Sequence, residues 1–429
     1  MSIYLASQSV VEHKGEFSDY VLLLCGIKQG APPSGILYIA YTLDIITMYN
    51  NKFNPEPLLY LVHLLMHADD ILLLATTKLL AVQKLRALIL YCKSNYIKLQ
   101  LAKCAILCVN SDDADDHLPI TVDGVVLENK KEEVYLGSVI TNSYKLVDDV
   151  EADVKKRQVN VIKYYAFLRS NSNAPVQVKA KVLHSCIVTS ILHNAETWAD
   201  AKVERLEVMY RRMIKSIVKV RITTCSEVLH IELDVPSIKT QILMKQWTFW
   251  TKVQELSKEC PLHHAITLGK QYKLKEIEHY EQLVASYSSK EEIKEKFMEQ
   301  TRQNIRKKAD KGQSKYIQYL KINPSLETPK IYKNINQLSD VSMIAGLRTS
   351  SHNLQIEMGR RTRTPKEERK CLCCAIEDEE HFLLRCNLYK DIRDRHSIHA
   401  TLSLPCVLDE VRHVEYIKEL YKRRKELKA

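Results

Sequence analysis

The chain is poor in residues that interrupt helices and in long apolar runs. Its 429 residues include only 10 glycines and 12 prolines, so long helices should dominate the fold. The longest apolar stretch, residues 58–66, is interrupted by His63 and is far shorter than the ~20 residues that a helix needs to cross a bilayer. The N-terminal stretch MSIYLASQSVVEHKGE has no charged segment followed by an apolar one, so it predicts no secretion signal. We therefore expect no membrane partner.

The composition is typical of a folded protein with free thiols. Hydrophobic residues make up 45% and charged residues 27% of the chain, which predicts a soluble globular protein rather than a disordered one. The length suggests two or three domains. Of the 12 cysteines, eight are scattered and four fall between residues 371 and 386. In the absence of a secretion signal, this distribution predicts reduced thiols and an intracellular protein of the nucleus, the cytoplasm or both.

Charge is distributed unevenly along the chain. Residues 1–150 contain 12 Lys and Arg against 17 Asp and Glu, whereas residues 151–429 contain 51 against 35. An acidic first third joined to a basic remainder suits a protein that binds a polyanion and carries carboxylates at its centre. Solvated helix faces are the alternative, and charge alone favours them slightly.

Apolar periodicity predicts short strands in the first third and helices after residue 150. The first third should contain strands at 58–66 and 71–75, a helix at 78–98, and a mixed strand region at 97–140 with a polar loop at 111–117 and a turn at Asp123-Gly124.

Beyond residue 150, one amphipathic helix is clear. In AKVERLEVMYRRMIKSIVKV (201–220) the apolar residues fall on one face, and Arg211, Arg212, Lys215 and Lys219 fall largely on the other. Residues 270–320 are rich in Lys, Glu and Gln, which predicts either a long surface helix or a linker.

Asp69 and Asp70 stand side by side between two apolar segments, in HADDILLLA (67–75). Adjacent carboxylates at a strand turn can bind hard cations such as Mg²⁺. Two such ions about 3.5–4 Å apart can activate an attacking hydroxyl and stabilise a leaving pyrophosphate. A solvated turn is the usual explanation of Asp-Asp alone, but strands on both sides would hold the pair rigidly.

The segment GIKQGAPPSGILY (26–38) is a second candidate. Its glycines and the Pro32-Pro33 pair predict a tight turn, with Gln29 and Ser34 as polar groups at the entry to an apolar helix. Gly30 lets a base or a sugar approach the backbone closely. An ordinary loop before a helix fits this stretch equally well.

Four motifs in order, GIKQGAPPSG, HADDILLLA, KLQLAKC and VYLGSVI, resemble the reverse transcriptases of non-LTR (LINE-like) retrotransposons. The segment HSCIVTSILHNAETW (184–198) resembles the thumb-side helix that follows the palm of this family. The resemblance implies RNA-directed DNA polymerisation, with an RNA template, a DNA primer or target and dNTPs as partners. By position, it implies catalytic Mg²⁺ binding at Asp69 and Asp70 and a catalytic contact with the triphosphate at Lys103. It also implies nucleotide or template contacts at Gln29, Gly30 and Ser34, and a primer grip at Tyr135, Leu136 and Gly137.

Three departures from the family pattern bear on activity. The family's fingers and first palm aspartate lie N-terminal to the first motif, where only 25 residues precede Gly26 and Asp19 is in the wrong context. We therefore expect this chain alone, as a truncated form, not to polymerise. His67 stands where the family has an aromatic residue. Gln100 stands where it has Asn, and the Gly beside the motif lysine is absent.

CLCCAIEDEEHFLLRC (371–386) carries cysteine and histidine at metal-ligand spacing. Cys371, Cys374, His381 and Cys386 form the pattern C-x2-C-x6-H-x4-C, and three thiolates with one imidazole suit a closed tetrahedral Zn²⁺ site. Cys373 can replace Cys374 or remain free. Zinc knuckles of this composition bind single-stranded nucleic acid.

The sequence around this cluster again resembles the C-terminal regions of non-LTR element proteins. Candidate phosphate contacts near it are Arg348, Arg360, Arg361 and Arg363. A generic basic surface is the alternative. The residues after Cys386 show no constellation typical of a nuclease, so we do not expect DNA cleavage.

The predicted fold is α+β. Its parts are a partial right-hand polymerase palm at 1–145, a helical thumb at 146–260, a charged helical connector at 261–340, a small CCHC zinc-binding module at 341–400 and a basic C-terminal helix at 401–429. The predicted function is that of a truncated non-LTR reverse transcriptase. One alternative is a non-catalytic nucleic-acid-binding remnant that uses the basic thumb and the zinc cluster. Another is a truncated gene product that does not fold.

Overall fold

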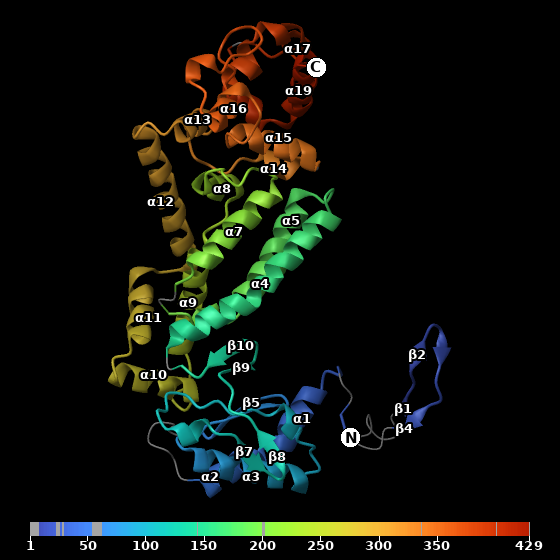
Figure 1. Cartoon of the computed structure of the whole chain (residues 1–429), viewed down its shortest axis with the longest axis vertical. Helices are drawn as coiled ribbons and strands as arrows, with labels where there is room; N and C mark the ends of the chain where they lie inside the picture. Colours follow the sequence, from blue (N-terminus) through green and yellow to red (C-terminus); the bar gives the residue numbers. More distant parts are fainter. Residues whose placement is uncertain are drawn as a thin grey trace. The chain divides into compact units, whose positions relative to one another are not determined.

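The computed structural model describes residues 8–22, 26–27, 30–53, 62–143, 145–199, 202–335, 337–399 and 401–428. The chain divides into two compact units (Figure 1). The first lies within residues 1–145 and 257–265, and the second within residues 146–256 and 266–429.

The strands of the first unit pair as two-stranded antiparallel sheets among the described residues. The pairs are β1 (Gln8–Ser9) with β4 (Val21–Leu22), β2 (Glu12–His13) with β3 (Glu16–Phe17), β5 (Leu64–His67) with β6 (Asp70–Leu73), β7 (Ile120–Val122) with β8 (Val125–Leu127), and β9 (Glu132–Tyr135) with β10 (Ser138–Thr141).

Two of these hairpins were expected from the sequence. The turn at Asp123-Gly124 is confirmed between β7 and β8, where both residues have positive φ, 52° and 80°. A hairpin surrounds HADD, but β5 and β6 are half-buried rather than fully buried. The first part of the predicted 58–66 strand lies partly outside the described residues, which resume at residue 62.

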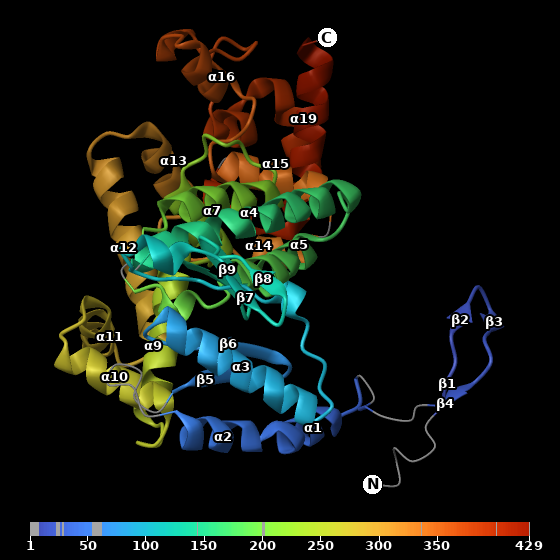
Figure 2. The same ribbon diagram turned by 60° about the horizontal axis from the view of Figure 1, so that its bottom comes forward.

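Helices of the first unit pack beside the β5–β6 hairpin, as Figure 2 shows for α2 and α3. The helices of the first unit are α1 (Ser34–Thr42), α2 (Asp44–Lys52), α3 (Lys78–Ser94) and the 3-10 turns η2 (Leu101–Lys103) and η3 (Ala114–His117). The helix predicted at 78–98 is therefore confirmed, although it ends earlier. It begins at a Thr77 cap, whose side chain accepts a hydrogen bond from Leu80 N. Tyr49 of α2 donates to the Lys84 carbonyl oxygen of α3 at 2.6 Å.

The second unit is helical. Its first part contains α4 (Leu146–Ser170), α5 (Val176–Val182), the π-helical turn η4 (Leu183–Val188), α6 (Thr189–Ile191), η5 (Ala195–Thr197), α7 (Glu204–Ile217), α8 (Ser226–Leu233) and α9 (Ile238–Gln254). Helices α4 and α7 lie side by side (Figures 1 and 2).

The charged middle of the chain forms helices rather than a linker. After α10 (Pro261–Gln271), which starts in the 257–265 segment, come α11 (Lys275–Ser286), α12 (Lys290–Asp310), α13 (Ser314–Ile322), α14 (Ile331–Asn334) and α15 (Leu338–Arg348). Helix α12 is a surface helix with a buried stripe that includes Ile293, Met298 and Ile305.

The C-terminal part packs onto the same core as the earlier helices. It contains α16 (Gln355–Thr362), η6 (Lys366–Glu368), η7 (His381–Arg385), η8 (Asn387–Tyr389), α17 (Lys390–Arg395), α18 (Leu404–Asp409), η9 (Val411–His413) and α19 (Val414–Lys428). One hydrophobic cluster runs from Val150 to Leu420. It joins segments that were predicted as thumb, zinc module and terminal helix; those finer boundaries stay predictions.

Helix α7 shows both the success and the limit of the apolar pattern. Leu206, Tyr210 and Met213 are buried, as their spacing predicts. Lys215 was expected on the polar face, but its side chain is buried and donates to the Ile222 carbonyl oxygen at 2.7 Å. The following loop folds back to supply that acceptor, which the helical pattern alone does not reveal. No helix among the described residues is long and apolar enough to span a membrane.

Candidate functional site

Asp69 and Asp70 lie at the tip of the β5–β6 hairpin. His67 pairs with Asp70, so Ala68 and Asp69 form the turn. Ala68 has φ 53°, a left-handed value that short hairpin turns require and that residues with a Cβ rarely adopt. Both aspartates are exposed. The local sequence thus presents two adjacent carboxylates on a tight turn whose flanking strands are half-buried.

The charges of these two carboxylates affect the pKa values of two tyrosines. Burial raises the pKa of Tyr38, on α1, and the Asp69 charge raises it further. Burial also raises the pKa of Tyr135, at the end of β9, and the Asp70 charge adds to it. A negative charge disfavours ionisation of a nearby phenol. The Asp70 charge therefore reaches Tyr135, a predicted primer-grip residue.

Leu136 and Gly137 form the turn between β9 and β10, because Tyr135 pairs with Ser138. Their φ values are 47° and 84°, the positive pair typical of the tightest hairpin turns. This turn leaves Tyr135 as the last residue of β9.

The remaining predicted nucleotide contacts are only partly described. Gln29 lies outside the described residues. Gly30 has φ 81°, and no atom lies within 4 Å of the position that a Cβ would take there, so its backbone is open to approach. Ser34 begins α1, and Lys103 is an exposed residue at the end of η2. Their roles stay predictions.

The C-terminal Cys/His cluster is gathered by the fold itself. The Sγ atoms of Cys371 and Cys386 lie 3.8 Å apart, those of Cys373 and Cys386 3.7 Å apart, and Cys373 Sγ lies 3.1 Å from His381 Nε2. All four ligand atoms fall within 4.8 Å of one another. Thiolates at about 2.3 Å from a tetrahedral Zn²⁺ stand about 3.8 Å apart, so the donor set fits zinc. Among the described residues, no other His, Cys, Asp and Glu side chains form such a group of three or more.

Cys373, not the predicted Cys374, is the second thiol of this cluster. The Cys374 N–H donates to the Cys371 carbonyl oxygen at 2.9 Å, closing a tight turn. Cys374 has φ 70° and is exposed. The pattern is thus C-x-C-x7-H-x4-C. Spacing alone left both thiols open, and the left-handed turn residue decides between them.

The protonation states of the cluster follow from burial. Burial raises the pKa of Cys371, and it raises that of Cys386 to about 12. Burial opposes ionisation of Cys373 as well, but a backbone hydrogen bond at Ala375 and the neighbouring thiols lower its pKa. Burial also lowers the pKa of His381, which keeps the imidazole neutral and able to bind a metal. Metal binding would therefore release protons from the buried thiols.

Arg348 was predicted to contact phosphate, and this prediction is wrong. Its side chain is 0% exposed. Arg348 Nε lies 2.7 Å from Glu232 Oε2, and Nη2 lies 3.0 Å from Oε1. Tyr319 and Tyr332 donate to the same carboxylate at 2.8 and 2.6 Å. This arginine ties α8, α13, α14 and α15 together instead of facing a ligand.

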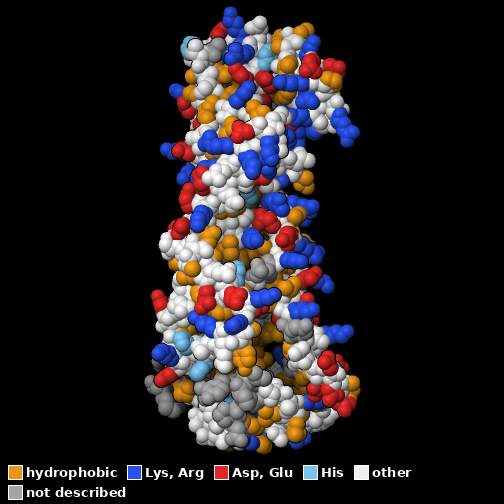
Figure 3. All heavy atoms as spheres, turned by 90° about the vertical axis from the view of Figure 1, so that its left-hand side faces the viewer, with side chains coloured by type: hydrophobic (Ala, Val, Ile, Leu, Met, Phe, Trp, Pro, Cys, Tyr) orange, Lys and Arg blue, Asp and Glu red, His pale blue; other side chains and the backbone are white. Residues whose placement is uncertain are grey.

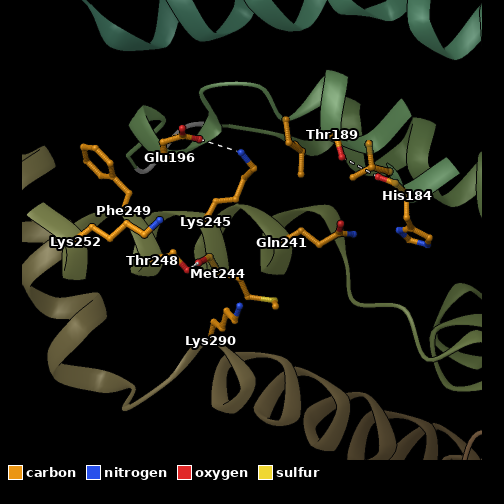
Figure 4. Close-up of a pocket in the computed structure, with 12 residues that line it drawn as sticks. His184, Thr189, Glu196, Gln241, Met244, Lys245, Thr248, Phe249, Lys252 and Lys290 are labelled. Atoms are coloured by element: carbon orange, nitrogen blue, oxygen red, sulfur yellow. Dashed lines mark hydrogen bonds and ion pairs between the residues drawn. The ribbon is translucent and has the colours of Figure 1, made fainter. Parts of the chain in front are cut away.

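A pocket of about 500 Å³ lies within the second unit, between α9 and the 184–196 segment (Figure 4). Lys245 reaches from α9 to Glu196 at 3.1 Å. Lys252 and Lys290 add positive charge, and Met244 and Phe249 supply apolar surface. His184 lines the other end, and burial lowers its pKa. On the face in Figure 3, basic and acidic side chains are interspersed.

A comparison with known families finds a match in the first part of the chain. Residues 4–140 match the family model described as reverse transcriptase (RNA-dependent DNA polymerase). The match contains Asp69, Asp70 and Tyr135, and it supports a reverse transcriptase, whose substrates are a nucleic-acid template and dNTPs and which uses a divalent metal. A comparison with curated proteins found no match.

Sequence reasoning missed Tyr38 as a neighbour of the aspartates. It is the last residue of the GIKQGAPPSGILY segment. The family-like segment therefore extends one helical turn into α1, which is the signal that could have identified it.

Proposed function

We propose that the first unit carries the nucleotidyl-transfer site of a non-LTR type reverse transcriptase, with Asp69 and Asp70 as the catalytic carboxylates. The observation that carries this proposal is the match to the reverse transcriptase model over residues 4–140, which contain both the exposed Asp69-Asp70 turn and Tyr135, whose pKa is raised by burial and by the Asp70 charge. In the proposal, β5–β6 and β9–β10 belong to a right-hand palm. The order of the four sequence motifs supports the non-LTR assignment.

The chemistry assigned to the hairpin is attack of a primer 3′-hydroxyl on the α-phosphate of a dNTP. The P–O bond to the primer forms, and pyrophosphate leaves. Magnesium held by Asp69 and Asp70 would lower the pKa of the attacking hydroxyl and offset the charge on the leaving pyrophosphate. Tyr135, with Leu136 and Gly137, is assigned to the primer end. Lys103 is assigned to the triphosphate, and Gln29, Gly30 and Ser34 to the nucleotide or template.

The second unit is proposed to act as the thumb and as a nucleic-acid-binding module. Its lysine-lined pocket and the Cys/His cluster support this role. Zinc would be held by Cys371, Cys373, His381 and Cys386 and would be structural, because four protein ligands leave no open position. We place the protein inside the cell, in the nucleus or the cytoplasm, where thiols stay reduced.

A second candidate function is nucleic-acid binding without catalysis. The gathered Cys/His cluster favours it, since that site is complete within the described residues and does not depend on Asp69 or Asp70.

The deciding experiment combines RNA-templated primer extension with a strand-binding assay, using wild-type protein, Asp69→Ala and Asp70→Ala. Mg²⁺-dependent extension that both substitutions abolish supports the polymerase. No extension by wild type, with salt-sensitive binding that survives both substitutions, supports the non-catalytic alternative. Extension that survives both substitutions contradicts the assignment of the aspartates.

A further inference from the structure

Arg221 and Arg361 converge on one side-chain oxygen from distant parts of the second unit. Arg221 lies in the loop between α7 and α8, and Arg361 lies near the end of α16. Both donate to Asn353 Oδ1, Arg361 from 3.4 Å and Arg221 more closely. Neither guanidinium forms an ion pair with a carboxylate among the described residues. The two cations share the Asn353 oxygen, and the other acceptor of Arg361 is the neutral Met358 Sδ.

The surroundings leave this pair short of negative charge. Burial lowers the pKa of Arg221, and the Arg361 charge lowers it further. Burial also lowers the pKa of Lys315, as do the charges of Arg360, Arg221 and Arg361. The nearby carboxylate of Glu357 is already shared by Lys315 and Arg360. An anion that entered here would relieve this repulsion.

A hollow of about 340 Å³ adjoins Asn353. Ser339, Ser342 and Ser351 offer hydroxyl groups around it, and Tyr421 supplies an aromatic surface. Its volume is near the lower end of ligand pockets, roughly 300–1,000 Å³. Gly346 also lines it, and a Cβ there would stand 3.2 Å from the Ser351 carbonyl oxygen, so this wall is close-packed.

Hydrogen bonds from α19 and from Glu377 hold the backbone around Asn353. Arg424 of α19 donates to the Asn353 carbonyl oxygen at 2.9 Å. It also binds the buried Glu377 carboxylate through Nε and Nη2, at 2.6 and 2.7 Å. Glu377 in turn accepts from Gln355 N at 2.7 Å. The backbone is held by these contacts, whereas the Asn353 side chain is exposed, so the proposal requires it to turn away from the two arginines.

We propose that Arg221 and Arg361 bind one backbone phosphate of single-stranded nucleic acid, in the place that the Asn353 carboxamide oxygen occupies, with the adjoining nucleotide in the hollow beside Tyr421. Arginine forks match phosphate oxygens in geometry and charge. A base must be unpaired to enter a hollow and stack on an aromatic ring. The inference rests on the proposed function only for the identity of the ligand as nucleic acid.

The test measures the affinity of the full chain for a fluorescein-labelled single-stranded RNA of about 20 nucleotides, and for DNA of the same sequence, across a salt series. Arg221→Gln and Arg361→Gln should each weaken binding roughly tenfold and lower the salt slope by about 0.7. Arg395→Gln is the matched control, because Arg395 is exposed and paired with Glu419 in the same unit. RNA and DNA losing affinity alike indicates recognition of the phosphate and base, and loss on RNA alone indicates that the ribose hydroxyl is also read.

Asn353→Ala distinguishes a ligand site from a structural contact. If the Asn353 oxygen holds the place of a phosphate, its removal should strengthen binding roughly two- to tenfold. If the arginines merely hold the loop to Asn353, Asn353→Ala should weaken binding or leave it unchanged, and that result overturns the proposal. Losses in Arg221→Gln and Arg361→Gln no larger than in Arg395→Gln also overturn it. An equal loss on a duplex of the same sequence excludes the inserted nucleotide.

Failure of this site and failure of the proposed function are separable. Strand binding that follows the arginine pattern, in a protein whose extension ignores Asp69 and Asp70, supports the phosphate site and contradicts the polymerase. Extension that requires both aspartates, with binding unaffected by Arg221→Gln and Arg361→Gln, gives the opposite result.

Discussion

The two candidate metal sites differ in how much the protein organises them. Asp69 and Asp70 are exposed on a hairpin of two four-residue strands. Cys371 and Cys386 are buried at 7% and 0% exposure, in a cluster that packs on the largest core of the molecule. Exposed carboxylates contribute little to folding, whereas buried thiolates that share a metal are linked to it directly. Substitutions in the Cys/His cluster should therefore affect stability, and substitutions of Asp69 and Asp70 should affect catalysis.

The largest effect on stability is expected at the Cys/His cluster. Cys386→Ser should abolish zinc binding and destabilise the second unit by more than about 4 kcal/mol, because it removes a buried ligand of the proposed metal. Zinc content and thermal unfolding, with and without a chelator, check this prediction.

The choice of ligands is tested with a matched pair. Cys373→Ser should lose zinc, and Cys374→Ser should keep it, since Cys374 is exposed on the turn. The reverse result would restore the ligand set that spacing first suggested.

A large effect that needs no metal is expected at Arg348. Arg348→Met leaves the Glu232 carboxylate, 1% exposed, without its cation, and breaking such a buried pair costs about 3–5 kcal/mol. Urea unfolding measures it. The control Arg412→Gln, in an exposed pair with Glu410, should change stability by less than about 1 kcal/mol. Similar values for both variants would mean that the buried network does not support the core.

These residues also show what the sequence can predict. The HADD hairpin, the Asp123-Gly124 turn and the 78–94 helix follow from local alternation and turn chemistry, so they were predictable. Arg348 was not, because its partner Glu232 lies 116 positions away. A lone arginine in a basic stretch is usually exposed. The choice between Cys373 and Cys374 depended on one left-handed residue that spacing does not reveal.

A smaller effect on stability is expected when the pH is lowered. Burial lowers the pKa of His184 and His230 below the ordinary value of 6.5. The unfolded chain therefore binds protons first as the pH falls. The stability that these two histidines contribute to the folded protein is therefore fully present above about pH 6.5 and declines below it. Thermal unfolding of zinc-saturated protein between about pH 7.5 and 5.5 should show this decline, and His184→Phe should reduce it. If His184→Phe and wild type show the same pH dependence, the pKa of His184 is not lowered in the folded protein.

The smallest effect is expected at the aspartate hairpin, and it tests the geometry on which the proposed function rests. Asp70→Asn should change the free energy of unfolding by no more than about 0.5 kcal/mol, as for most exposed sites. It should nevertheless lower the pKa of Tyr135, because the Asp70 charge raises that pKa. Asp69→Asn should lower the pKa of Tyr38 and leave Tyr135 unchanged, since the charge that reaches Tyr38 is that of Asp69. NMR titration of ring-labelled tyrosine, with Tyr135→Phe and Tyr38→Phe to assign the signals, measures both. If Asp70→Asn leaves the pKa of Tyr135 unchanged, the Asp70 charge does not reach Tyr135. The two carboxylates are then not distinguished from an ordinary solvated turn.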